Sequence, residues 1–193
     1  MKGCRPLDEQ EVQEVASSFG GRFALRDRAL FLLGVKSGFR ISELLSLRVG
    51  DVVKNGKLVE RVTVSRRHMK KKLEGRTVIL NAEARDALAL WIAELQEDGA
   101  IRDTPVFRSR KGDDKPINRK HAWRILNEAY ETNELTGTLG THSMRKTFAN
   151  RVHVLLGRDL VKTQRALGHK NINSTVSYLS FLEEEIDAAI LAL

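Results

Sequence analysis

Three separated segments of the chain hold residue types that could act on a phosphate ester. The first contains Arg40, and the second, about 100 residues later, contains His142 and Arg145, which stand one helical turn apart. The third has His169 in a Leu-Gly-His sequence, and Tyr178 follows nine residues later. Arginines can bind phosphate oxygens bidentately, and histidines can move protons. A tyrosine hydroxyl can attack phosphorus when a base or cationic surroundings assist it.

Each of these residues would be ordinary alone. Single arginines lie most often on surfaces or in salt bridges, and His169 could simply follow a helix end at Gly168. Tyr178, beside Val176 and Leu179, could be a half-buried packing residue. Several independent coincidences would be needed to place all of them in this order. The joint pattern therefore favours one common site.

The charge balance favours a polyanionic partner. The 193 residues include 33 Lys and Arg against 25 Asp and Glu, a formal net charge of +8, and nucleic acid is the commonest partner of such a surplus. The chain has no apolar run of about 18 residues and no signal-peptide pattern. Cys4 is its only cysteine. We therefore expect a cytoplasmic protein of one main domain, with no membrane span and no cysteine-based metal site.

Hydrophobic periodicity predicts a mostly helical domain. An Asp8–Glu11 capping box should begin one helix, and residues 24–37 should form a second that is buried nearly all round. Further helices are expected from Ile41 to Leu47, after the N-caps Asn81 and Asn118, and at about 143–156, 160–167 and 174–181, with Asp159 and Asn173 as the last two N-caps. The helix after Asn118 should direct Trp123, Leu126 and Tyr130 toward the core, and residues 98–117 should be mostly loop.

A small antiparallel sheet is expected in the middle of the chain. Leu58 to Ser65 and Thr77 to Leu80 are β-prone, and the very basic run Arg66 to Lys72 lies between them. The pattern predicts a hairpin that presents lysines. The fold class is therefore mainly α with a small antiparallel β-sheet, an α+β arrangement.

The motifs resemble those of the tyrosine recombinase family, also called phage-type integrases, from about residue 6 to 182. The matching pattern is Arg in G-x-R-x-S-E, then H-x-x-R, then L-G-H, then Tyr nine residues on. The resemblance implies the catalytic-domain fold of that family, double-stranded DNA as partner, and strand cleavage without metal, ATP or another cofactor. It also implies a 3′-phosphotyrosine intermediate and a free 5′-hydroxyl that attacks a partner strand. Lys146 stands where many members have histidine, a departure that we expect to be tolerated.

The resemblance assigns a role to each matching residue. Tyr178 is the nucleophile, and Arg40 and Arg145 hold the scissile phosphate. His142 assists the tyrosine, and His169 binds the phosphate or assists proton transfer. Glu43 resembles the acidic residue that supports the site.

A lysine of the hairpin should protonate the leaving 5′-oxygen. Aligning Arg76 to Leu80 with the second strand of the family's hairpin selects Lys71, although a shift of one residue would select Lys70 or Lys72.

Other basic residues are candidate DNA contacts. They lie in the hairpin, in the following loop and on the helix after Asn118: Arg66, Arg67, Lys70, Lys72, Arg108, Arg110, Lys111, Arg119, Lys120 and Arg124.

Residues 1–182 should form the catalytic domain, and residues 183–193 a short amphipathic tail helix. The family's N-terminal core-binding domain is expected to be absent, so the chain is either an excised domain or a compact recombinase. By resemblance, the tail should dock on a neighbouring copy within a DNA-bound tetramer, although docking on its own domain is the alternative.

Two other functions fit part of the pattern. A type IB topoisomerase uses similar arginines, lysine and tyrosine, but this chain is short for one and L-G-H favours recombinases. A DNA-binding regulator with a relic active site would keep the basic faces and lose catalytic groups, whereas all of them are present here.

Overall fold

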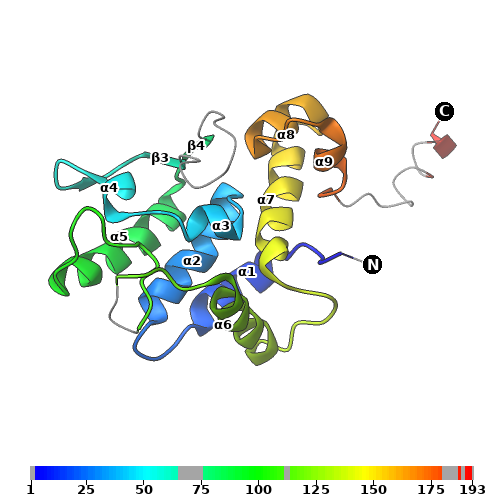
Figure 1. Ribbon diagram of the computed structural model, residues 1–193. Helices are drawn as coiled ribbons and strands as arrows, with labels where there is room; N and C mark the ends of the chain where they lie inside the picture. The colour runs from blue at the N-terminus through cyan, green and yellow to red at the C-terminus, as the bar shows by residue number, and fades with distance from the viewer. Residues whose placement is uncertain (1–2, 65–75, 111–113, 180–186, 188–189, 193) are drawn as a thin grey trace. The chain divides into compact units, whose positions relative to one another are not determined.

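A computed structural model describes residues 3–64, 76–110, 114–179, 187 and 190–192 of the protein (Figure 1). It divides into two units, Met1–Phe148 and Ala149–Leu193. Helix α7 (Thr141–Leu155) begins in the first unit and ends in the second. Within the described residues, no helix is long and apolar enough to cross a membrane.

The first unit is built around the buried helix α2 (Ala24–Ser37). Its residues from Ala29 to Val35 have almost no contact with solvent, as the uninterrupted apolar run predicted. Helix α5 (Ala82–Glu97) packs along α2, and α1 (Glu9–Ser18) and α3 (Ile41–Leu44) contact it as well. The core of the unit therefore lies around α2, whose C-terminal end leads directly into Arg40.

Local capping signals fix most helix starts. The Asp8–Glu11 capping box is present, and Asn81, Asn118 and Asp159 each accept a backbone N–H at the start of α5, α6 (Arg119–Thr132) and α8 (Leu160–Leu167). The prediction for α9 (Ile172–Val176) was wrong. Its N-cap is Asn171, which accepts the N–H of Asn173 at 2.8 Å, so the cap lies two residues before the expected one and the helix begins at Ile172.

Two separate two-stranded sheets replace the single expected one. Strands β3 (Arg61–Val64) and β4 (Arg76–Ile79) pair antiparallel as predicted, with Val64 opposite Arg76. Strands β1 (Val53–Lys54) and β2 (Lys57–Leu58) follow the short helix α4 (Val49–Val52) and were not predicted. They are joined by Asn55-Gly56, both at positive φ, which is the strongest short hairpin signal in a sequence.

One expected core residue lies outside the core. Trp123 is 46% exposed, whereas the buried face of α6 consists of Ala122, Leu126, Ala129 and Tyr130. A helix buries an arc little wider than 100°, and Trp123 falls at the edge of the arc centred on Leu126. The second unit contains the last turns of α7 together with α8 and α9, and α8 packs against α9.

Candidate active site

Arg40 is held at the start of α3 by Glu43. The Glu43 carboxylate accepts the backbone N–H of Arg40 at 2.7 Å through Oε2 and its guanidinium Nη1 at 3.0 Å through Oε1. Glu43 is buried, while about a third of the Arg40 side chain is exposed. Glu43 therefore orients a partly accessible arginine, which suits the supporting role that the resemblance assigned to it.

Gly38 turns the chain from α2 toward Arg40. Its φ of 60° is a left-handed value that closes the helix, and its N–H donates to the Gly34 carbonyl at 3.1 Å. A Cβ at this position would also collide with the ring of Phe148. Both the backbone and the packing thus require glycine in the G-x-R motif.

Two further arginines converge on this turn. The Gly38 carbonyl accepts hydrogen bonds from Nη1 of Arg145 and, at 2.9 Å, from Nη1 of Arg76. Arg76 also donates to the Ser37 carbonyl at 2.7 Å through Nη2. Arg145 is fully buried, so its bond to Gly38 fixes the plane of its guanidinium beside the turn that carries Arg40.

Burial and like charge lower the pKa of Arg76 to about 9, with the desolvation of the guanidinium as the larger cause and Arg145 as the next. Glu43 opposes this shift. The Arg76 guanidinium lies over the rings of Phe39 and Phe148, 5.1 and 5.7 Å from their centroids. Arg76 thus remains charged at neutral pH and is held by two carbonyls and two aromatic faces.

His142 lies in the field of the same arginines. Partial desolvation lowers the pKa of its imidazole, and the positive charges of Arg145, Arg40 and Lys146 lower it further. The ring is exposed to solvent. A neutral imidazole at pH 7 can accept a proton, which is the form that a general base requires.

The second unit brings together His169 and Tyr178. Gly168 ends α8 in the left-handed conformation, and the buried His169 follows it. Nδ1 of His169 lies 3.0 Å from Oγ1 of Thr175, and the rings of His169 and Tyr178 have centroids 5.3 Å apart. Tyr178 is half-buried just after α9, and its carbonyl accepts Nδ2 of Asn150 at 3.0 Å.

The predicted site residues thus fall into two groups. Arg40, Glu43, His142 and Arg145 belong to the first unit, and His169 and Tyr178 to the second. The hairpin residues Arg66, Arg67, Lys70, Lys71 and Lys72, and Lys111 in the loop, lie outside the described residues. Arg110, Arg119, Lys120 and Arg124 are exposed, and Arg108 pairs with Asp98 at 3.2 Å.

Two residues that contact groups of the site, Arg76 and Thr175, were not predicted from the sequence. Arg76 served only to align the hairpin, although an arginine at the start of a short β-prone strand could have indicated a buried role. Thr175 carries no sequence signal of its own. Within the described residues, no three His, Cys, Asp or Glu side chains gather in a way that could hold a metal ion.

Known proteins are similar to this chain in sequence and in fold. The sequence profile of the phage integrase family matches residues 5–185. The probable integrase/recombinase YoeC of Bacillus subtilis is 30% identical over 164 residues, which cover 85% of this chain and 82% of that protein. The type 1 fimbriae regulatory protein FimE of Escherichia coli is 31% identical over 186 residues, which cover 92% of this chain and 86% of that protein.

Solved structures match almost the whole chain. XerA recombinase matches with a TM-score of 0.79 and 21% identity, over 100% of this chain and 64% of that one. XerH site-specific recombinase, in a post-cleavage complex with a palindromic difH substrate, matches with a TM-score of 0.75 and 23% identity, over 96% and 51%. The chain therefore spans between half and two thirds of these two recombinases.

The fold is that of the catalytic domains of DNA recombinases. The chain belongs to the phage integrase family, and it is a catalytic domain of the tyrosine recombinase type. The resemblance and the fold class inferred from the sequence are thereby confirmed.

Proposed function

We propose that this domain cuts and rejoins double-stranded DNA at specific sites in the cytoplasm, with Tyr178 as nucleophile. The observation that carries the proposal is that Arg40 and Arg145 lie at the turn at Gly38, on residues that match the family's motifs. His142, which also matches, lies in the electrostatic field of both arginines. XerH, which shares the fold, was solved with its DNA substrate. The net charge of +8 suits the same partner.

The proposed reaction has two phosphoryl transfers. Oη of Tyr178 attacks the phosphorus, the bond from phosphorus to the 5′-oxygen breaks, and a 3′-phosphotyrosine forms. His142 takes the tyrosine proton, and Lys71 gives a proton to the leaving 5′-oxygen. The 5′-hydroxyl of another strand then attacks the phosphotyrosine and releases Tyr178. No bond to a nucleotide cofactor is made or broken in either step.

Arg40 and Arg145 stabilise the charge that develops on the non-bridging oxygens. Planar guanidinium groups suit this task because they donate in pairs and keep their charge. His169, oriented by Thr175, completes the contacts to the phosphate. Lys71 remains a proposal from alignment, with Lys70 and Lys72 as alternatives.

A suicide DNA substrate tests the proposal. Its nick lets the 5′ end diffuse away after cleavage, so the protein should be trapped covalently on the DNA. Tyr178→Phe should give no adduct while its affinity for DNA stays within about twofold, because only the hydroxyl reacts. Tyr130→Phe is the matched control and should still give the adduct, since Tyr130 is buried against the core. An adduct with Tyr178→Phe would refute the assignment.

Adduct formation separates the first alternative function, and a relaxation and strand-exchange assay separates the second. A regulator with a relic site would bind DNA and give no adduct with the unaltered chain. A type IB topoisomerase would relax supercoiled DNA without joining strands from two substrates, whereas a recombinase exchanges them.

We further propose that the tail docks on a neighbouring copy in a DNA-bound tetramer. Ile190 and Leu191 are 60% and 87% exposed in the single chain, so they are not covered by it. Three apolar residues at the end of α7 and the start of α8 are exposed, and we call them the α7–α8 patch: Val154, Leu155 and Val161. The two helices are tied there by His153 and Thr163, whose Nδ1 and Oγ1 atoms lie 2.9 Å apart. Apolar groups exposed on both elements would gain by covering each other.

A further inference from the structure

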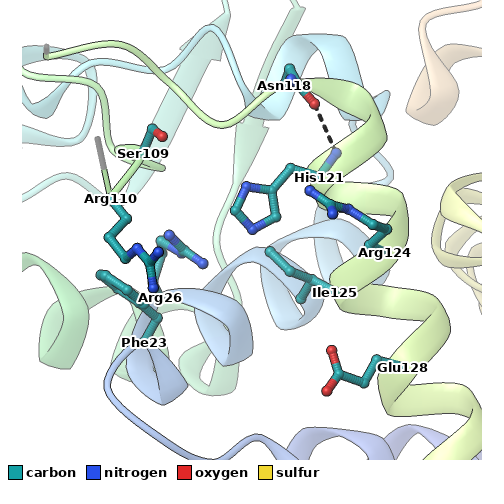
Figure 2. Close-up of a pocket in the computed structure, with 9 residues that line it drawn as sticks. All are labelled: Phe23, Arg26, Ser109, Arg110, Asn118, His121, Arg124, Ile125 and Glu128. Atoms are coloured by element: carbon teal, nitrogen blue, oxygen red, sulfur yellow. Dashed lines mark hydrogen bonds between the residues drawn. The ribbon is translucent and has the colours of Figure 1, made fainter. Parts of the chain in front are cut away.

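A second cationic cavity lies in the first unit, away from the turn at Gly38. It has a volume of about 570 Å³ and opens between the start of α2, the loop at Ser109-Arg110 and helix α6 (Figure 2). We call it the basic pocket, and its main lining residues are Phe23, Arg26, Arg110, His121, Arg124 and Ile125. Figure 2 shows Arg26 and Arg110 beside Phe23, facing His121 and Ile125 from α6.

The basic pocket is separate from the catalytic groups. Arg26 is in the first turn of α2, and Gly38 follows the last turn of the same helix. At the rise of a regular helix, the two positions are about 18 Å apart. A phosphate bound by Arg40 and Arg145 therefore could not fill this pocket at the same time.

Arg26 forms a rigid positive wall of the pocket. Its side chain is only 2% exposed, and it donates to Asp27 at 2.8 Å and to the Arg108 carbonyl at 3.2 Å. Its guanidinium lies 4.4 Å from the centroid of the Phe23 ring. Because Asp27 already balances this charge, the excess positive charge of the pocket comes from Arg110 and Arg124.

Arg110 and Arg124 are exposed at the pocket, and within the described residues neither forms an ion pair. Glu128 is the one carboxylate among the described lining residues, and it lies a turn of α6 beyond Arg124 (Figure 2). The pocket thus presents two available guanidinium groups against one carboxylate.

The pKa of the His121 imidazole reflects the positive charge of the basic pocket. Burial lowers the pKa of its imidazole most, and the charges of Arg26, Arg124 and Arg110 lower it further, whereas Asp27 acts in the opposite direction. A bound anion would reverse the effect of these charges.

We propose that the basic pocket binds the phosphate of a nucleotide, independently of the scissile phosphate. Arg110 and Arg124 donate to the phosphate oxygens, and Phe23 and Ile125 pack against the attached sugar. Two arginines from different elements suit a phosphate because each can donate a pair of hydrogen bonds. The apolar side chains make the cavity suitable for a nucleotide rather than for a bare ion.

The phosphate has two possible sources, the backbone of a DNA duplex or a free nucleotide. In the duplex case the inference rests on the proposed function, and the phosphate lies on the DNA that the domain cuts. About 18 Å corresponds to about five base-pair steps of one strand. A duplex that extends at least this far beyond the scissile bond would reach both the catalytic arginines and the basic pocket.

The experiment follows the His121 imidazole of the full chain by NMR, assigned by comparison with His121→Gln. Saturating deoxyadenosine monophosphate, or a 20-base-pair duplex, should raise the pKa of His121, because a nearby phosphate anion favours the imidazolium. Arg124→Gln and Arg110→Gln should each weaken mononucleotide binding about tenfold, as expected for losing a charge-assisted hydrogen bond. Arg85→Gln removes an exposed arginine from α5 and should change the affinity less than about twofold.

Competition separates the sources. If the duplex displaces the mononucleotide from the pocket, the phosphate belongs to the DNA backbone. If both bind together, the pocket takes a free nucleotide. The inference is overturned if neither ligand moves the His121 pKa, or if Arg85→Gln weakens binding as much as Arg124→Gln. Covalent trapping on the suicide substrate is measured in parallel. If the unaltered chain forms no adduct, the proposed function is refuted. If it forms the adduct but neither ligand changes the pKa of His121, only the proposal for the basic pocket is refuted.

Discussion

Arg76 and Arg145 donate hydrogen bonds to the same acceptor, the carbonyl oxygen of Gly38. Two like charges are thereby held close together, and the pKa of Arg76 is lowered first by its burial and then by the charge of Arg145. The two guanidinium groups fix the turn between α2 and α3 from strand β4 and helix α7. Arg76 and Arg145 therefore both hold the turn that precedes Arg40.

The first prediction concerns the stability that Arg76 gives to this turn. Arg76→Met should lower the free energy of unfolding by about 2 kcal/mol, because charged donors to the Ser37 and Gly38 carbonyls are lost. Arg76→Lys should lose less, since an ammonium can still bind one carbonyl. Urea denaturation measures both. Arg61→Met, at an exposed site on the paired strand β3, is the control; equal losses at the two sites would contradict the role of Arg76.

The second prediction concerns the pH dependence of cleavage. His142 must be neutral to accept a proton, and its pKa is lowered from 6.5, so the acid limb of the single-turnover rate should lie below pH 6.5. Lys146 is one cause of the lowering. Lys146→Gln should therefore raise the pKa of His142 and move the acid limb to higher pH, with the plateau rate little changed.

Lys162→Gln is the control for that prediction. It removes an exposed lysine of α8 that does not contribute to the His142 shift, so the acid limb should stay where it is. An acid limb that Lys146→Gln leaves in place would show that His142 does not act as the base.

Sequence signals that act over a few residues gave most of the fold. The capping residues Asp8, Asn81 and Asn118 lie within three residues of the N–H groups they accept, so the chain itself shows where these helices start. The Asn55-Gly56 turn is equally local, but the strands β1 and β2 that it joins have two residues each, too few to show the alternation that predicts a strand. Trp123 was misplaced because the direction of the core is set by packing from other elements.

The site was predictable to the extent that its motifs are contiguous. Arg40, His142, Arg145, His169 and Tyr178 stand in recognisable patterns, and their roles stay predictions. Arg76 contacts a carbonyl 38 positions away, and no local pattern specifies such a contact. The choice of Lys71 over its neighbours also stays a prediction, because the hairpin tip lies outside the described residues.

The third prediction concerns Thr175, which we treat as a positioning residue for His169. When the Thr175 hydroxyl donates to Nδ1, the proton of the neutral ring lies on Nε2, from which it can be donated to a phosphate oxygen. Thr175→Val removes the hydroxyl at nearly the same volume and should slow single-turnover cleavage about fivefold. Thr175→Ser keeps the hydroxyl and should stay within about twofold. Equal rates for the Val and Ser variants would separate Thr175 from the reaction.

The last prediction concerns the tail. Deleting residues 183–193 should leave the binding of one protein copy to a half-site unchanged, because no proposed DNA contact lies in this segment. Strand exchange should fall steeply, since a short helix needs an apolar surface to dock on and the proposed surface belongs to a neighbouring copy. Leu155→Ser, which makes the most exposed residue of the α7–α8 patch polar (82% exposed), should reproduce the defect from the other side of the contact. Gel shifts on half-sites measure DNA binding, sedimentation measures the synaptic complex, and a two-substrate assay measures strand exchange.

Lys170→Ser, a substitution at an exposed residue outside the patch, is the control and should change none of these three measurements. Normal exchange by the truncated chain would rule out docking in trans, and a truncated chain that no longer folds would favour docking of the tail on its own domain.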